Sequence, residues 1–244
     1  MRNIKLTIEY DGTNYHGWQE QDNLQTIQGC LKQAIYDLCK ENVIIYGAGR
    51  TDAGVHAKAQ IANFRTESKI PDYAFAKALN TLLPEDIAIK ASVEVPDSFH
   101  SQFAAQKKAY SYNIINRKTR PTMDRKFMHW VWVLLDIDRM QEGANYLLGK
   151  HDFSAFEAAN SPRQSSVRTI YEIRVEKKQD YVKIWVEADG FLYHMVRNIA
   201  GTLIAVGKKK YAPEHIKRVL ESRNRTLAAS TAPACGLCLE YIEY

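Results

Sequence analysis

The sequence predicts a mixed α+β fold built from two similar α/β halves. The elements expected from hydrophobic periodicity follow the order β-α-β-β-α-β and then β-α-β-β-α-α-β. Strand and helix do not alternate throughout, as they would in a doubly wound nucleotide-binding fold. We therefore expect halves at residues 1–104 and 105–244. Together they should form one extended, mixed and largely antiparallel sheet with helices on one face.

The first half begins with a strand at residues 3–10, where Ile4, Leu6 and Ile8 alternate with polar residues. Thr26 is a suitable N-cap for the amphipathic helix that follows. The elements expected after the first strand are a helix at 27–40, strands at 43–46 and 59–65, a helix at 72–83 that Pro84 ends, and a strand at 87–95.

The second half is expected to start with a long strand, because aromatic and aliphatic residues alternate up to residue 116. Gly207 is the natural stop of a mostly apolar helix. The expected elements are a strand at 99–116, a helix at 136–148, a hairpin of 168–177 and 181–188, helices at 191–206 and 213–221, and a strand at 236–242.

Composition bounds the function only loosely. The chain has 244 residues and a net charge of +5, which permits a polyanionic partner without requiring one. No apolar stretch is long enough to span a membrane and no secretory leader is visible, so the cytoplasm is the default location. Cys235 and Cys238 have CxxC spacing but lack a second pair, so we expect two small buried residues and no metal site.

The glycine-rich loop at 47–56 is the most informative segment. It holds Arg50 and Asp52 two residues apart, and a neighbouring guanidinium favours the ionised carboxylate. An ionised carboxylate in a cleft can act as a nucleophile or a general base. Ordinary turn chemistry, with the aspartate accepting backbone hydrogen bonds, is the alternative. The glycine spacing matches neither of the common phosphate-binding loops.

The same loop, Gly49–Ala57, resembles the signature of the tRNA pseudouridine synthase A family. Four further segments resemble motifs of that family and appear in its order along nearly the whole chain. They are 10–21 with 26–28, 99–103 with 108–112, 190–199, and 231–237.

The resemblance implies the pseudouridine synthase fold with a central cleft, and a role for four residues. Asp52 becomes the catalytic aspartate, and Arg50 helps to displace the target nucleotide. Tyr110 becomes the active-site tyrosine that stacks on the base, and Arg197 the ion-pair partner of Asp52. On pattern alone, Tyr110 also fits a core strand, and Arg197 fits a helix arginine that reaches solvent.

Pseudouridine forms when the C1′–N1 bond of uridine breaks and a C1′–C5 bond replaces it, so neither cofactor nor metal is expected. Asp52 could attack C1′, remove a sugar proton to give a glycal, or add to C6. The residues leave these routes open, and we favour the glycal route. Flipping the base costs on the order of a few kcal/mol, which an aromatic platform partly offsets.

The RNA itself should be bound mainly through its phosphates. Trp18 and Gln19 can reach RNA, although Trp18 fits the core equally well. The basic candidates are Lys107, Lys108, Lys208, Lys209, Lys210 and the connector at 117–126. By resemblance, the substrate is the tRNA anticodon stem-loop at positions 38–40 and the enzyme is a homodimer. A non-catalytic RNA-binding module and a small-nucleotide enzyme are the competing hypotheses.

Overall fold

The computed structural model describes residues 1–158 and 165–244, and its contacts divide the chain into two compact units. One unit contains Met1–Gln106 and Leu239–Tyr244, and the other contains Lys107–Cys238. The division follows Gln106, and the last six residues return to the first unit. There the N–H of Gln106 donates to the Glu243 carbonyl (2.9 Å). The sequence predicts a second half at 105–244, whereas the last six residues belong to the first unit of the structure.

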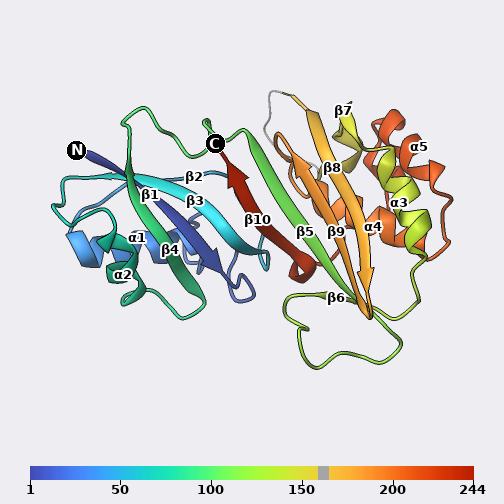
Figure 1. Ribbon diagram of the computed structural model, residues 1–244, viewed down its shortest axis with the longest axis horizontal. Helices are drawn as coiled ribbons and strands as arrows, with labels where there is room; N and C mark the ends of the chain where they lie inside the picture. The colour runs from blue at the N-terminus through green and yellow to red at the C-terminus, as the bar shows by residue number, and fades with distance from the viewer. Residues whose placement is uncertain (159–164) are drawn as a thin grey trace. The chain divides into compact units, whose positions relative to one another are not determined.

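The first unit is a small antiparallel sheet with two helices (Figure 1). The strand order is β4-β1-β3-β10, and β2 pairs with β3. The elements are β1 (Arg2–Tyr10), α1 (Ile27–Cys39), β2 (Ile45–Gly47), β3 (His56–Thr66), α2 (Ala74–Asn80), β4 (Ile87–Val95) and β10 (Leu237–Glu243). This order reproduces the predicted β-α-β-β-α-β sequence of elements.

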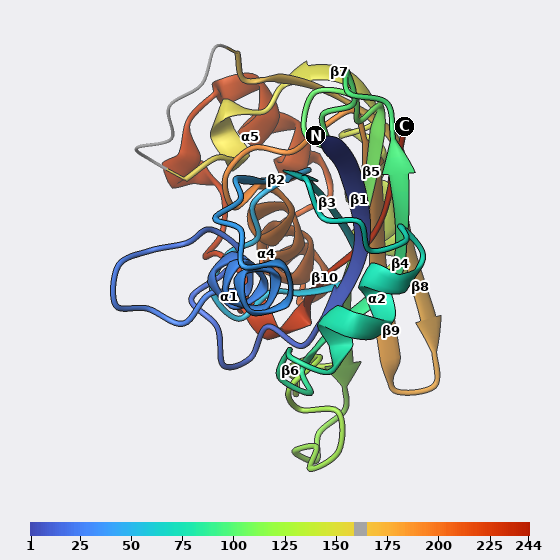
Figure 2. The same cartoon turned by 90° about the vertical axis from the view of Figure 1, so that its left-hand side faces the viewer.

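Alternation of side chains places the core of the first unit on one face of its sheet. Ile4, Leu6 and Ile8 of β1 are fully buried, and Phe64 of β3 lies opposite Ile4 in the antiparallel register. Phe75 of α2 packs edge-on against Phe64, with ring centroids 5.7 Å apart. In Figure 2, α1 is seen nearly end-on beside β1. Burial of this apolar face therefore holds helix and sheet together.

Helix α1 begins and ends at residues that suit its termini. The hydroxyl of Thr26 accepts a hydrogen bond from the N–H of Gly29 (3.2 Å), as the sequence predicts for an N-cap. Lys40 adopts the left-handed conformation with φ of 59°, and its N–H donates to the Tyr36 carbonyl. This arrangement ends the helix in the way that left-handed C-caps do.

The second unit has the strand order β5-β9-β8-β7, with β6 parallel to β5. Its helices α3 and α4 contact β8 and β5 respectively (Figure 1). The elements are β5 (Lys107–Asn116), β6 (His129–Val131), α3 (Ile137–Asn145), β7 (Gly149–Asp152), β8 (Val167–Lys178), β9 (Tyr181–Ala188), α4 (Met195–Gly207) and α5 (Glu214–Ser222), with short 3-10 turns at Ser154–Phe156, Arg225–Leu227 and Ala234–Gly236.

The core of the second unit follows the same alternation. Tyr112 and Ile114 of β5 face Ile184 and Val182 of β9 across the ladder, and all four are buried. Helix α4 is almost entirely buried, which agrees with its apolar sequence. The prediction of a mixed α+β fold with largely antiparallel strands is confirmed. The central cleft stays a prediction.

Two details of the prediction are wrong. Residues 99–106 form turns and irregular backbone, so β5 starts only at Lys107. Ser101 explains the difference, because its N–H donates to the side chain of Asn63 (2.9 Å) and its hydroxyl donates to the Tyr46 carbonyl. Side-chain partners thus replace a strand ladder. The short strands β6 and β7 were not predicted, since three or four residues show too little periodicity.

Within the described ranges, none of the helices has the length and apolar character needed to cross a bilayer. The same residues contain no cluster of three or more His, Cys, Asp or Glu side chains that could hold a metal ion.

Candidate active site

Asp52 lies in the connection between β2 and β3 of the first unit, and its residue is half-buried. A tight turn follows it, in which the N–H of Val55 donates to the Asp52 carbonyl (3.1 Å). Gly54 has φ of +77°, a conformation that glycine adopts without a steric penalty. The turn predicted from the glycine-rich sequence is therefore present, and it holds the backbone of Asp52 in one conformation.

A second segment, residues 10–18, clamps this loop from the side. The N–H of Trp18 donates to the Thr51 carbonyl (3.0 Å), and the N–H of Gly54 donates to the Tyr15 carbonyl (3.2 Å). The hydroxyls of Tyr10 and Thr51 are hydrogen-bonded at 2.8 Å in a buried environment. Both sides of Asp52 are thus tied to the segment that leads out of β1.

Close packing of backbone on backbone explains one glycine of that segment. A Cβ atom on Gly17 would lie 2.5 Å from the carbonyl oxygen of Thr51 and 3.1 Å from the carbonyl carbon of Asp52. Gly17 also has φ of +90°. Only glycine satisfies both conditions without strain, so Gly17 lets the two segments meet directly beneath Asp52.

Trp18 belongs to the core rather than to an exposed surface. Its side chain is 1% exposed, and its indole lies where a Cβ on Gly47 would be only 2.5 Å away. The core alternative therefore describes Trp18, whose indole is not available to a partner in this structure. Gln19 is half-buried, and its amide donates to the side chain of Gln28 (2.7 Å). Arg50, two residues before Asp52, is exposed.

In the second unit, Tyr110 lies on β5 and is 8% exposed. Its ring meets that of Phe191 edge-on, with centroids 5.0 Å apart and planes at 86°. Lys108, two residues earlier, points to the same face of the strand. Burial, and then the nearby charge of Arg168, lowers the pKa of the Lys108 ammonium to about 8. The first residues of β5 therefore present an aromatic and a cationic side chain on one face.

Arg197 stands in the first turn of α4 and is half-buried. Its Nε–H donates to the carbonyl of Ala232 (2.9 Å), and the N–H of Ala232 donates back to the Arg197 carbonyl (3.1 Å). The next carbonyl, that of Pro233, accepts from the hydroxyl of Tyr112 (2.9 Å). The guanidinium of Arg197 is thus oriented by the segment that precedes β10.

The predicted RNA-contact lysines differ in their surroundings. Lys107 makes an ion pair with Glu187 (3.4 Å), and Lys209 makes one with Asp136 (3.4 Å). Lys210 lies over the ring of Tyr211, 5.3 Å from its centroid. Lys208 is exposed at the end of α4. The Lys209 ammonium is mostly exposed, whereas the Asp136 carboxylate that it pairs with is largely covered.

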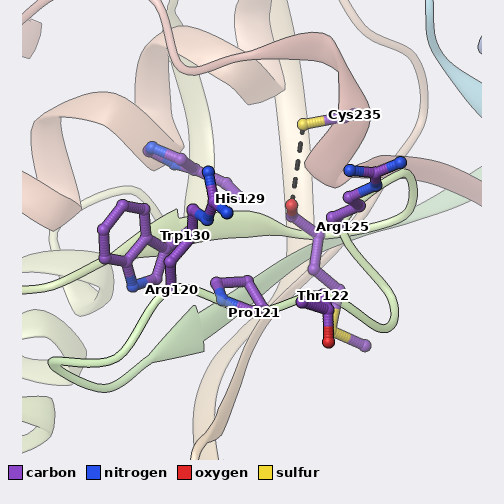
Figure 3. Close-up of a pocket in the computed structure, with 8 residues that line it drawn as sticks. Arg120, Pro121, Thr122, Arg125, His129, Trp130 and Cys235 are labelled. Atoms are coloured by element: carbon purple, nitrogen blue, oxygen red, sulfur yellow. Dashed lines mark hydrogen bonds between the residues drawn. The ribbon is translucent and has the colours of Figure 1, made fainter.

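The basic connector predicted at 117–126 lines a cavity of about 340 Å³ in the second unit (Figure 3). Two arginines, an imidazole, an indole and a thiol contribute to its wall, and the Cys235 thiol contacts the Met128 carbonyl at 3.7 Å. The lining residues are Arg120, Pro121, Thr122, Arg125, Met128, His129, Trp130 and Cys235. Sequence reasoning listed the two arginines as candidates but missed His129 and Trp130, because β6 carries no visible periodicity.

Comparison with known proteins shows that this protein belongs to the class of isomerases that form pseudouridine. A family model described as tRNA pseudouridine synthase matches residues 6–104 and 144–244. A Clostridium perfringens protein named tRNA pseudouridine synthase A 2 is 50% identical over all of both chains. A Thermoanaerobacter protein named tRNA pseudouridine synthase A is 47% identical, again over both full lengths. The chain belongs to the tRNA pseudouridine synthase A family, and it isomerises uridine in tRNA.

Among solved structures, a chain of a Cbf5-Nop10-Gar1 complex aligns with 82% of this chain and 54% of its own length. The TM-score is 0.35 and the sequence identity is 12%. The family membership favours the enzyme over the two competing hypotheses, a non-catalytic RNA-binding module and a small-nucleotide enzyme.

Proposed function

We propose that this enzyme acts on the anticodon stem-loop of tRNA at positions 38–40, with Asp52 as the catalytic carboxylate. The observation that carries the proposal is the loop around Asp52. Hydrogen bonds from Trp18 and to Tyr15 hold its backbone on both sides, while the Asp52 residue is only half-buried. A carboxylate held in a preorganised loop and accessible to a ligand suits covalent or general-base catalysis.

The bonds and protons of the reaction balance without a further reactant. The C1′–N1 bond of uridine breaks, the base turns, and C5 bonds to C1′. The proton on C5 leaves to solvent, and N1 of the released ring takes one up. Asp52 would assist by forming and then breaking a bond to C1′ or C6, or by removing a sugar proton and returning it. We favour the last route, which passes through a glycal.

Three other residues complete the proposed site. Tyr110 is held edge-on by Phe191, which suits a platform for the flipped base. Arg197, whose Nε–H donates to the Ala232 carbonyl, is proposed as the ion-pair partner of Asp52, as the family resemblance implies. Arg50 is exposed beside Asp52, and we assign it the displacement of the target nucleotide from the stem.

The remaining assignments concern the partner and the assembly. We propose that Gln19, Lys107, Lys108, Lys208, Lys209 and Lys210 contribute to tRNA binding, together with the arginines of the cavity. The homodimer stays a prediction from the family resemblance, and the cytoplasmic location stays a prediction from the sequence.

Release of tritium from tRNA carrying 5-³H-uridine tests the role of Asp52, because C5 loses its hydrogen only when pseudouridine forms. Asp52→Asn and Asp52→Ala should release no tritium while binding tRNA as the wild type does. Asp37→Asn makes the same change on the exposed face of α1 and should leave the rate unaltered. Wild-type release by either Asp52 variant would overturn the assignment.

The choice of substrate site is tested separately. Transcripts in which the uridines at 38, 39 and 40 are replaced by cytidine, singly and together, should lose the corresponding product. Undiminished tritium release from the triple replacement would place the modified uridine elsewhere in the tRNA.

A further inference from the structure

Arg225 donates hydrogen bonds to both of the segments next to Arg197, helix α4 and residues 228–232. It begins the 3-10 turn Arg225–Leu227 of the second unit, and its residue is half-buried. One Nη group donates to the carbonyl of Ala229 (3.0 Å). The other donates to the side-chain oxygens of Asn198 (2.9 Å) and Thr231 (3.0 Å). Its hydrogen-bond acceptors in the described residues are all neutral, so the arginine serves as a planar, multivalent donor.

The acceptor on the helix side is the immediate neighbour of Arg197 in α4. Asn198 is fully buried, and its Nδ2 donates to the Phe156 carbonyl (2.7 Å). Its Oδ1 accepts from the hydroxyl of Thr231 (2.7 Å) as well as from Arg225. These three bonds set the orientation of the amide and leave the buried oxygen satisfied.

The acceptors on the other side belong to residues 228–232, which run along α4 in backbone contact. A Cβ on Gly201 would lie 2.0 Å from the carbonyl oxygen of Ser230. The N–H of Ala229 donates to the hydroxyl of Thr202 (3.2 Å). The segment then reaches Ala232, which makes both hydrogen bonds with Arg197. Arg225 therefore connects α4 to the segment 228–232. The Ala232 carbonyl of that segment orients the guanidinium of Arg197.

We propose that Arg225 is a positioning residue for the reaction: through Asn198 and residues 228–232 it fixes the guanidinium of Arg197. The inference rests on the proposed function, in which Arg197 faces the catalytic carboxylate. Arg225 acts at a distance and touches neither substrate nor reacting atoms in this account.

The chemistry of the guanidinium explains why arginine is needed at residue 225. Its rigid fork presents five donors in one plane, whereas the ammonium of lysine is a compact group with three. Asn198 lies on α4, whereas Ala229 and Thr231 lie on the segment 228–232, and the fork reaches all three. Burial lowers the pKa of the Arg225 guanidinium, which shows that its charge is held there against a desolvation cost.

The first test compares Arg225→Gln, Arg225→Lys and Arg218→Gln in single-turnover tritium release. Arg218 is exposed on α5 of the same unit, so its variant removes the same charge and should keep the wild-type rate. Arg225→Gln should lower the rate constant by about 10- to 100-fold, because a displacement near 1 Å has effects of that size. Its Kd for tRNA should change by less than about threefold, and Arg225→Lys should restore part of the rate.

A double-mutant cycle distinguishes positioning from general loss of structure. If Arg225 acts through Arg197, adding Arg225→Gln to Arg197→Lys should lower the remaining rate much less than it lowers the wild-type rate. The proposal is overturned if the two effects multiply, or if Arg225→Gln keeps the wild-type rate.

A readout without substrate separates this proposal from the proposed function. The Nε–H resonance of Arg197, identified by its loss in Arg197→Lys, should exchange slowly with water in the wild type and faster in Arg225→Gln. Equal exchange in both would refute the positioning role. If Asp52→Ala kept full activity while this difference was present, the proposed function would fail and the bracing of Arg197 by Arg225 would stand.

Discussion

Substitution of Gly17 by alanine should disturb the Asp52 loop without touching any group that reacts. The new Cβ would lie 2.5 Å from the Thr51 carbonyl oxygen, whereas ordinary van der Waals contacts begin near 3.4 Å. The two segments must therefore separate by about 0.9 Å, the difference between those two distances. Neither contacting atom is the end of a flexible side chain, so the backbone itself has to move.

Two terms set the expected loss of stability in Gly17→Ala. Alanine at φ of +90° costs about 1–2 kcal/mol, because its Cβ approaches the following carbonyl oxygen. Forcing an extra carbon into a packed contact costs about 1–3 kcal/mol more. The free energy of unfolding should fall by about 2–5 kcal/mol, and a shift of that size next to Asp52 should lower the rate by roughly 100-fold.

Gly149→Ala is the matched control. Gly149 has φ of +93°, but the nearest atom to its added Cβ is the Nε2 of His151 at 3.7 Å, an ordinary contact. This variant should lose only the conformational term, about 1–2 kcal/mol, and keep the wild-type rate. Urea unfolding gives the stability of both variants, and single-turnover tritium release gives their rates.

The reasoning would be refuted by a wild-type rate in folded Gly17→Ala, since the loop would then tolerate the displacement. It would also be refuted if Gly149→Ala slowed the reaction as much, because the rate loss could not then come from contact with the Asp52 loop.

The cavity offers two further predictions. Arg120→Gln and Arg125→Gln should each reduce the slope of log affinity for tRNA against log salt by about 1, measured by filter binding, and an unchanged slope would remove that arginine from the phosphate contacts. Burial, and then the charge of Lys208, lowers the pKa of His129 to about 4 from 6.5. Between those values the unfolded chain binds the proton and the folded chain does not, so stability should fall as pH drops from 6.5 to 4. His129→Phe should flatten this dependence in urea unfolding, and an equally steep profile would contradict it.

Local periodicity accounts for most of the elements in both units. The strand at 3–10, the helix at 27–40 and the hairpin around 178–180 match β1, α1 and the β8–β9 pair to within about two residues. Their side chains repeat at the strand or helix period, and burial of one face follows directly from that repeat. The loop chemistry around Asp52 was equally visible, because its glycines and turn residues are adjacent in the chain.

The errors arise where partners lie far apart in the sequence. Residues 99–106 alternate like a strand, but Ser101 is held by Asn63 and Tyr46 instead of by a ladder. For Trp18, which stands in a polar segment, the sequence left core packing and RNA contact equally open, and its 1% exposure places the indole in the core.

The periodicity of this chain predicts its α+β fold, and the glycines around Asp52 predict a turn there, because both signals lie in residues close together in the sequence. The contacts that support these local elements are not local. Arg225 reaches Asn198 across 27 positions, and Gly17 meets Thr51 in a fold where β1 pairs with β3. Such contacts depend on the path of the whole chain through space, which no short window of sequence records.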